Sequence, residues 1–329
     1  PHWLHNGYGK HLIDVYAGMC AVEAGDVSIS QKEPECEQLK DFDWGSDFIT
    51  IHTGTSLEIK NHYNMQGLIK YCKVPVIHVG GKDDPPIAAF ARAHKPESPL
   101  ISLLGQTSPQ ELAWILARSK LHIGMDSFPG HVAAAVETDC ITLFGSTFDR
   151  NCIPRPHTVA GGICEILPNT PQKDPYVLIG KSLSMAINPS SRGECIKPCH
   201  LAKCTKPKKC IDNIKIYDDV IERLLDSDWA EKKGWSALFA RADDVKISAY
   251  CIILNGIDMD LPIAEVISNH LGFSDEFVMV DGGSDDGTWE LLQDLKNHWG
   301  DRLIQNGNIQ PSKLWCEMIP RLCCLTFHV

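Results

Sequence analysis

Polar side chains that can bind an anion follow an apolar run in the middle of the chain. Residues 121–124 predict a buried strand, and Asp126, Ser127 and His131 come soon after it. Three alanines and a second apolar run, residues 140–144, complete a strand, turn, helix and strand, which predict a βαβ unit with parallel strands. Such sheets bind ligands at the carboxyl ends of their strands, where helix N-termini present free N–H groups. The three polar side chains therefore form a candidate site.

A second polar turn follows the predicted strand of residues 48–52. Thr55 and Ser56 offer hydroxyl groups, and Lys60 adds a positive charge a few residues later. Hydroxyls, turn N–H groups and an ammonium group all donate to phosphate oxygens, so this turn suits a diphosphate. Both turns also have a simpler interpretation, a solvated loop without a ligand, and the residues alone leave that alternative open.

The stretch from Asp126 to Thr147 resembles the motif D-S/T-G-x-x-H-x-A-A-A, followed by a strand and F-G-x-T, of the family 9 glycosyltransferases, the heptosyltransferase family. The matching residues are Asp126, Ser127, His131, Ala133, Ala134, Ala135, Phe144, Gly145 and Thr147. Phe128 stands where the family has glycine. The turn HTGTSxxxK is similar to the family's nucleotide-sugar loop, and Asp83 or Asp84 would meet the donor's ribose or sugar hydroxyls. The donor-binding residues that the resemblance implies are Thr55, Ser56, Lys60, Gly80, Gly81, Asp83, Asp126, Ser127, Gly130 and His131.

The composition is that of an ordinary globular protein. The 329 residues are 43% hydrophobic and 22% charged, which suffices for one or two cores. The net charge of −11 disfavours nonspecific binding to nucleic acid. No apolar stretch approaches the ~20 residues of a membrane span, although peripheral contact with a membrane is compatible with the sequence. With no leader pattern and fourteen cysteines, many in apolar runs, we expect a reducing cytoplasm.

Alternating strands and helices predict an α/β fold with a doubly wound parallel sheet, which by resemblance is the Rossmann-like C-terminal half of a GT-B enzyme. Within it, Ser108, Pro109 and Glu111 predict a helix that starts with a capping box. The expected regions are a remnant of an N-terminal domain with a linker (1–44), the donor-binding domain (45–228), a second linker (229–245) and a partial further module (246–329).

Four cysteines near the end of the donor-binding domain raise the question of a zinc site. They are Cys195, Cys199, Cys204 and Cys210. Four thiolates suit tetrahedral zinc, but the gaps of three, four and five residues fit none of the common motifs, which use CxxC. A Cys-rich basic loop also closes the domain in the family that the chain resembles. We therefore predict a structural loop and no metal.

The last module ends a strand, helix and strand with the acidic turn DGGSDDGT, residues 281–288. Acidic loops also bind calcium, but the EF-hand spacing is absent and the flanking strands argue against it. The arrangement is similar to the opening of the family 2 glycosyltransferases, which have the GT-A fold. The resemblance implies that Asn255, Asp281 and Asp285 line a nucleotide pocket, and that a complete module would use Mg²⁺ or Mn²⁺. The expected metal-binding DxD motif is absent from residues 300–329.

We interpret the sequence as a heptosyltransferase-like glycosyltransferase that moves a sugar from a nucleotide-diphosphate donor to a glycan or lipid-linked acceptor in glycan or lipopolysaccharide-type biosynthesis. The family 9-like module needs no cofactor, because helix dipoles and basic side chains stabilise the leaving diphosphate. The family's general base lies in an N-terminal domain, so we name no catalytic residue and expect this chain to be incomplete for catalysis. Two alternatives stay open: a noncatalytic nucleotide-sugar-binding fragment, and a nucleotide-sugar epimerase of GT-B architecture.

Overall fold

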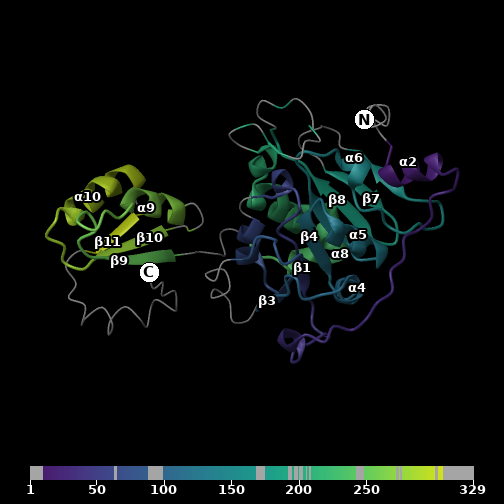
Figure 1. Ribbon diagram of the computed structural model, residues 1–329, viewed down its shortest axis with the longest axis horizontal. Helices are drawn as coiled ribbons and strands as arrows, with labels where there is room; N and C mark the ends of the chain where they lie inside the picture. The colour runs from purple at the N-terminus through teal and green to yellow at the C-terminus, as the bar shows by residue number, and fades with distance from the viewer. Residues whose placement is uncertain are drawn as a thin grey trace. The chain divides into compact units, whose positions relative to one another are not determined.

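The computed structural model divides the chain into two compact units (Figure 1). Unit 1 is Pro1–Arg241 and unit 2 is Ala242–Val329. The residues that the structure describes are 10–62, 65–87, 99–167, 175–191, 195, 199, 203–204, 206, 209–241, 248–271, 274, 276–300 and 303–306.

Unit 1 is built on an eight-stranded sheet with the strand order β3-β2-β1-β4-β5-β8-β7-β6. All neighbours from β3 to β8 run parallel, which confirms the expected α/β fold with a large, mostly parallel sheet. The strands are β1 (Ile49–Ile51), β2 (Val76–His78), β3 (Leu100–Ser102), β4 (Leu121–Met125), β5 (Cys140–Leu143), β6 (Cys164–Ile166), β7 (Tyr176–Ile179) and β8 (Leu183–Ile187).

One edge of this sheet differs from the sequence-based expectation of a wholly parallel sheet. β7 runs antiparallel to β8, and β6 runs antiparallel to β7. Residues 180–182 alone join β7 to β8, and so short a connection allows only an antiparallel hairpin. A parallel pair needs a crossover of about a dozen residues or more. The doubly wound parallel prediction is therefore wrong for β6 and β7.

The capping box predicted for α4 is confirmed. Ser108 Oγ accepts a hydrogen bond from Glu111 N at 3.3 Å, and Glu111 Oε2 accepts one from Ser108 N at 2.8 Å. The α-helices described in unit 1 are α2 (Leu12–Met19), α4 (Pro109–Leu116), α5 (Phe128–Ala135), α6 (Asp149–Cys152), α7 (Glu222–Asp226) and α8 (Asp228–Lys233). In the described part of the chain, no helix has both the length and the apolar character that crossing a membrane requires.

Helix α5 packs closely on β4 and β5 because its inner face carries small side chains. Ala133 and Ala134 are buried there. At Gly130, a Cβ atom would lie 3.2 Å from Pro154 Cγ, tighter than most real contacts, so a larger residue would push the helix outward. This close packing fixes the turn between β4 and α5, which carries Asp126.

The N-terminal segment lies along unit 1 as part of the same compact body. Asp26 accepts hydrogen bonds from the backbone N–H and the hydroxyl of Thr158, both at 3.0 Å. Further along the segment, the rings of Trp44 and Trp114 meet edge-on with their centroids 4.6 Å apart. Residues 10–44 therefore contribute both polar and aromatic contacts to the donor-binding domain that was expected to begin after them.

The predicted linker over residues 229–245 is wrong for residues 229–241. Residues up to Arg241 belong to unit 1, and Trp235 is only 1% exposed. Phe239 is fully buried and forms an isolated antiparallel bridge with Cys72. The physical reason is the apolar content of this stretch. Burial of a large aromatic ring is favourable in free energy, so such rings pack into the core of unit 1 and do not stay in a solvated linker.

Unit 2 has a three-stranded parallel sheet with the order β11-β10-β9. Its core includes the fully buried side chains of Ile267, Phe277 and Leu292, which lie on different elements. The alternation of strand and helix agrees with the pattern expected for this module. The elements are β9 (Ser248–Ile253), α9 (Ile263–Leu271), β10 (Glu276–Asp281), α10 (Thr288–Trp299) and β11 (Leu303–Asn306).

Candidate functional site

Two loops meet at the carboxyl end of the sheet in unit 1. β1 and β4 are neighbouring parallel strands, and Ile51 lies opposite Ile123 in their register. The polar turn of residues 52–60 follows β1, and the turn that begins at Asp126 follows β4. Because parallel strands end at the same edge, residues far apart in the sequence come together there.

Asp126 is the centre of these contacts. Lys60 Nζ donates to Asp126 Oδ2 at 2.7 Å, and Thr147 Oγ1 donates to the same oxygen at 2.5 Å. The Asp126 side chain is only 6% exposed, so its charge needs such partners to be tolerated. The motifs identified Lys60 and Asp126 as site residues. Thr147 belongs to the same motif, but its spacing does not indicate that it bonds to Asp126.

The hydroxyl turn after β1 is held by its own residues. Thr55 N donates to Asn61 Oδ1 at 2.7 Å, and the Thr55 hydroxyl donates to the carbonyl of Leu57 at 2.9 Å. Ser56 is exposed on the same turn, and Lys60 ends the short helix that follows it. The turn before Lys60 is therefore held by hydrogen bonds among its own residues. Asn61 was missed by the sequence analysis, because a single amide after a lysine carries no recognisable pattern.

The loop after β2 is tied to the end of β1 through Asp84. Its Oδ2 accepts from Gly81 N at 2.7 Å and lies 3.1 Å from His52 Nε2. Burial alone would raise the pKa of Asp84, but the bond and charge of His52 and the Gly81 N–H lower it below its ordinary value. Gly80 has a φ of +149°, which favours glycine. Asp83 is exposed, so Asp84 is the carboxylate that holds this loop.

The start of α5 places the remaining predicted residues beside the pair. Ser127 is the N-cap residue, although its side chain makes no capping hydrogen bond. His131 lies close enough to Asp126 and Lys60 for both charges to act on it. Desolvation by neighbouring atoms lowers the pKa of His131 although solvent reaches the side chain, while Asp126 opposes the change. Gly130 serves the packing of the helix.

Two groups without a motif also lie beside this site. Burial, followed by the charge of Asp126, raises the pKa of Cys152 to about 12, so the thiol stays protonated. His11 Nε2 donates to the carbonyl of Ile153 at 2.8 Å, and burial lowers the pKa of His11. His11 also acts electrostatically on His131. Neither was predicted as a site residue, since both come from other segments and reach the site only through the fold.

Unit 2 gathers its three predicted residues into one loop cluster. Asn255 Nδ2 donates to Asp285 Oδ1 at 2.9 Å, and Asp285 N donates to Asn255 Oδ1 at 3.1 Å. Ser284 Oγ donates to Asp281 Oδ1 at 2.5 Å and accepts from Asn255 N at 2.8 Å. The loops after β9 and β10 are thus linked at the carboxyl edge of this sheet.

Asp286 ties the same loops together and was not singled out from the sequence. Its Oδ2 accepts from the backbone N–H groups of Ile257 and Asp258, both at 2.9 Å, and its Oδ1 accepts from Thr288 N at 2.9 Å. Desolvation opposes ionisation, but these bonds and that of the Thr288 hydroxyl lower the pKa of Asp286 to about 2. Two adjacent aspartates in DGGSDDGT look equivalent in sequence, so their different roles appear only in the structure.

The described residues contain no group of three or more His, Cys, Asp or Glu side chains arranged to hold a metal ion. Cys195, Cys199 and Cys204 are free thiols. Whether the cysteine loop serves a structural role therefore stays a prediction.

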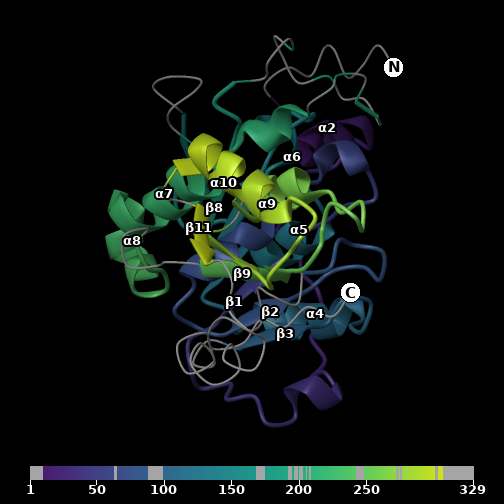
Figure 2. The ribbon, with the colours of Figure 1, turned by 90° about the vertical axis from the view of Figure 1, so that its left-hand side faces the viewer.

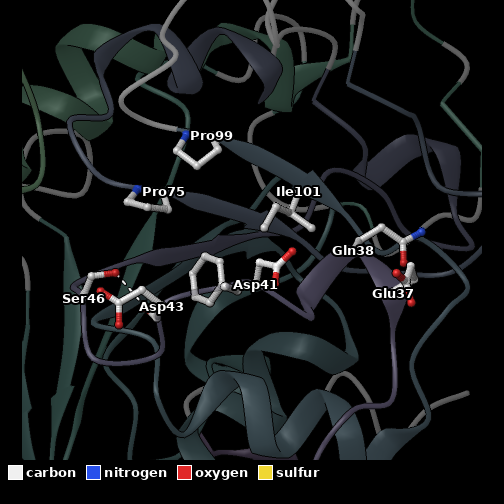
Figure 3. Close-up of a pocket in the computed structure, with 9 residues that line it drawn as sticks. Glu37, Gln38, Asp41, Asp43, Ser46, Pro75, Pro99 and Ile101 are labelled. Atoms are coloured by element: carbon white, nitrogen blue, oxygen red, sulfur yellow. Dashed lines mark hydrogen bonds between the residues drawn. The ribbon is translucent and has the colours of Figure 1, made fainter.

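A hollow of about 310 Å³ lies at the opposite end of the sheet from Lys60 (Figure 3). Pro75 and Pro99, which directly precede β2 and β3, form part of its wall. Glu37 and Asp41 line it as well, and Figure 3 labels both among the lining residues. Such acidic surroundings repel a diphosphate, so this hollow does not compete with the candidate donor site.

A comparison with known families finds a match for the region around the Lys60–Asp126 pair. Residues 23–174 match the family model described as glycosyltransferase family 9 (heptosyltransferase). The match includes both motif loops and Thr147. This part of the chain is therefore similar to the family 9 glycosyltransferases.

Two curated proteins are similar over a short stretch. Lipopolysaccharide heptosyltransferase 3 of Escherichia coli (strain K12) is 49% identical over 49 residues, and a protein of the same name from Escherichia coli is 45% identical over 49 residues. Each match covers 15% of this chain and 14% of the relative. The chain thus matches only a small part of the length of these relatives.

Two solved structures are similar over about half their length. The glycosyl transferase family 9 from Veillonella parvula DSM 2008 is 21% identical with a TM-score of 0.34, over 45% of this chain and 47% of that chain. The E. coli ADP-heptose lps heptosyltransferase II is 18% identical with a TM-score of 0.36, over 46% of this chain and 53% of that chain.

Proposed function

We propose, from the family 9 match over residues 23–174, that unit 1 is the donor-binding half of a GT-B glycosyltransferase. It binds a nucleotide-diphosphate sugar, and the sugar passes to a hydroxyl of a glycan or lipid-linked acceptor in lipopolysaccharide-type biosynthesis. The observation that carries the proposal is the meeting of Lys60, Asp126 and Thr147 at the carboxyl edge of the sheet. Both motif loops, which the family resemblance assigns to the donor, contribute to this one cluster.

Lys60 supplies the positive charge for the diphosphate that leaves when the sugar is transferred. Its ion pair with Asp126 restrains the ammonium group before the donor binds, so less side-chain entropy is lost on binding. The first turn of α5 and the hydroxyl turn around Ser56 follow β4 and β1 at the same edge and offer N–H and O–H donors. Since these protein groups can neutralise the developing charge, we propose transfer without a metal ion.

The proposal is tested by titrating the full chain with ADP, GDP and UDP in a calorimeter, with and without EDTA. We expect at least one of these nucleotides to bind equally well in both conditions. The matching nucleosides serve as controls, and their affinity should be at least roughly ten-fold lower because they lack the charge-assisted bonds to phosphate. Absence of binding by all three diphosphates, or binding only with added Mg²⁺, contradicts the proposal.

Unit 2 supports a second, separate proposal: it is the nucleotide-binding opening of a family 2-like GT-A module. The parallel sheet ends in the loop cluster that contains Asn255, Asp281 and Asp285, each of them predicted to contact the nucleotide. Gly283, with a φ of +95°, allows the tight turn in which the N–H groups of Gly283 and Ser284 bond to Asp281. A divalent cation belongs to this proposal only for a complete module.

A change in unit 2 separates the two proposals. In the same titrations, Asp281→Ala should remove one class of nucleotide sites and leave the metal-independent class of unit 1 intact. Asp294→Ala, a change on α10 outside the loop cluster, is the control and should leave both classes unchanged. A single class of sites that Asp281→Ala leaves unaltered argues against nucleotide binding by unit 2.

A cytoplasmic location is part of the proposal for the whole chain. Exposed free thiols such as Cys20 and Cys164 are typical of proteins that remain in a reducing compartment. Fractionation of cells that express the protein tests this point, and recovery mainly from an extracytoplasmic fraction contradicts it.

A further inference from the structure

A cavity of about 250 Å³ in unit 1 lies between the N-terminal segment and the mixed edge of the sheet. Its lining comes from the start of α2, from α6 and the residues after it, and from β6 and β7. Figures 1 and 2 agree in placing α2 beside α6. None of the predicted donor-site residues lines it, so it is a separate feature of the unit.

The floor of the cavity is apolar and uncharged. Tyr176 and Leu178 of β7 are buried, and both pack in a cluster with Ile163. The Tyr176 hydroxyl donates to Glu165 Oε1 at 2.7 Å. Burial, and then the bond to Glu165, raises the pKa of Tyr176, so this ring stays neutral at physiological pH.

The carboxylates of the rim already have partners. Asp14 forms an ion pair with Arg155, and Glu165 accepts the Tyr176 hydroxyl. His11 also lines the cavity, and both of its ring nitrogens bond to the backbone. Nε2 donates to the carbonyl of Ile153, and Nδ1 accepts from Ile13 N at 3.2 Å. Burial lowers the pKa of His11, which favours the neutral imidazole.

Two cations at the rim are left without a carboxylate. Among the described residues, neither Lys10 nor Arg150 has a carboxylate within ion-pair distance. The Arg150 guanidinium lies over the Tyr176 ring, with Cζ 5.6 Å from the ring centroid. A partly buried guanidinium with unused donors favours an anion, and its planar fork suits two oxygens at once. Glu165 lowers that attraction but does not cancel two positive charges.

The short helix α6 links the cavity to the candidate donor site. Arg150 and Cys152 both belong to α6, and the charges of Asp126 and Lys60 reach Cys152. Thr147, which bonds to Asp126, precedes Arg150 by three residues, a chain distance of at most roughly 11 Å. An acceptor whose hydroxyl reaches the donor could therefore place a charged substituent in the cavity.

We propose that this cavity binds a phosphate monoester carried by the acceptor sugar, with Arg150 as the main contact and Lys10 as the second cation. The inference rests on the donor-binding function proposed for unit 1. Two unpaired cations match a dianion, and the floor of Tyr176 and Leu178 receives the less polar face of the sugar ring. The bound phosphate orients the acceptor beside the donor site. Arg150 is thus a specificity-determining residue, not a catalytic one.

The test is calorimetric titration of the full chain with glucose 6-phosphate, inorganic phosphate and glucose. We expect glucose 6-phosphate to bind more tightly than either of the others, and Arg150→Gln to weaken its binding by roughly ten-fold or more. The control is Arg118→Gln, since Arg118 also lies over an aromatic ring, 3.5 Å from the centroid of Trp114, but on α4's side of the unit. That variant should bind glucose 6-phosphate as the wild type does.

Three results would overturn the inference. Glucose 6-phosphate that binds no better than glucose shows that there is no anion site. Equal affinity for inorganic phosphate and glucose 6-phosphate shows an anion site without an acceptor sugar. If Arg150→Gln weakens the binding of UDP, GDP or ADP as much as that of glucose 6-phosphate, the cavity belongs to the donor site. If no nucleotide binds to the wild type while glucose 6-phosphate binding still depends on Arg150, the proposed donor function fails and the anion site remains.

Discussion

Lys60 and Asp126 form an ion pair of 2.7 Å, although they are sixty-six residues apart in the sequence. Lys60 lies in the turn after β1 and Asp126 in the turn after β4. The pair therefore reports directly on the parallel pairing of these two strands. It also places a cation at the edge of the sheet where anionic ligands of α/β proteins bind.

The first prediction concerns the contribution of this pair to stability. Asp126→Asn keeps the size of the side chain but removes the charge that accepts bonds from Lys60 and Thr147. We expect the free energy of unfolding to fall by about 1–3 kcal/mol, because the ammonium group then lacks its partner in a partly buried place. Urea denaturation measures this difference.

The matched control is Asp47→Asn, which breaks the exposed pair between Asp47 and Lys120, whose side chains are 56% and 54% exposed. Exposed pairs contribute about 1 kcal/mol or less. Equal effects of Asp126→Asn and Asp47→Asn would show that the Lys60–Asp126 pair is no better shielded than an ordinary surface pair.

Much of the central sheet could be predicted from the sequence, because the apolar runs that become β1, β4 and β5 are buried at every position. Their shortness and the helix signals between them favour parallel strands. β6 could not be predicted in this way. All three of its residues are exposed, and a strand of three residues is too short for its sequence pattern to predict it.

The second prediction is a dependence of stability on pH that comes from His122. Burial lowers the pKa of His122 from its ordinary 6.5 to about 3 in the folded protein. Below pH 6.5 the unfolded chain takes up a proton that the folded chain refuses, so stability falls as the pH is lowered toward 3. The slope from this group is about 1.4 kcal/mol per pH unit.

The measurement is the free energy of unfolding between pH 7 and pH 4.5 for wild type and His122→Gln. The variant loses the bond between His122 Nδ1 and Thr50 Oγ1, so its absolute stability is expected to be lower. The informative quantity is the slope, which should be shallower in the variant. An unchanged slope would mean that His122 is not kept neutral by the fold.

The candidate site was predicted in part, and its limits have a physical cause. The motifs identified Lys60 and Asp126, because the rule for parallel sheets places both turns at one edge. They did not decide between Asp83 and Asp84. Which of two adjacent carboxylates turns inward depends on local backbone angles, here those of the loop that begins at Gly80 with a positive φ. The sequence shows the residue types but not these angles.

The third prediction tests the boundary of unit 1. Trp235 is 1% exposed, whereas a residue in a linker would be solvated. Trp235→Ala should lower the free energy of unfolding of unit 1 by about 3–5 kcal/mol, as expected for removing a buried ring. Trp229→Ala is the control, and its effect should be smaller because this ring is partly exposed. Near-neutral behaviour of Trp235→Ala would restore the linker interpretation.

The central claim is that the Lys60–Asp126 cluster binds the diphosphate of a nucleotide sugar. The most direct test is to measure the affinity of Lys60→Ala for the nucleoside diphosphate that the wild type binds best. We predict a loss of ~1–3 kcal/mol in binding free energy, the usual size for one charge-assisted contact to phosphate. Lys120→Ala, which removes a lysine that pairs with Asp47 at the far end of the sheet, should bind as the wild type does. Equal affinity of wild type, Lys60→Ala and Lys120→Ala would contradict the account.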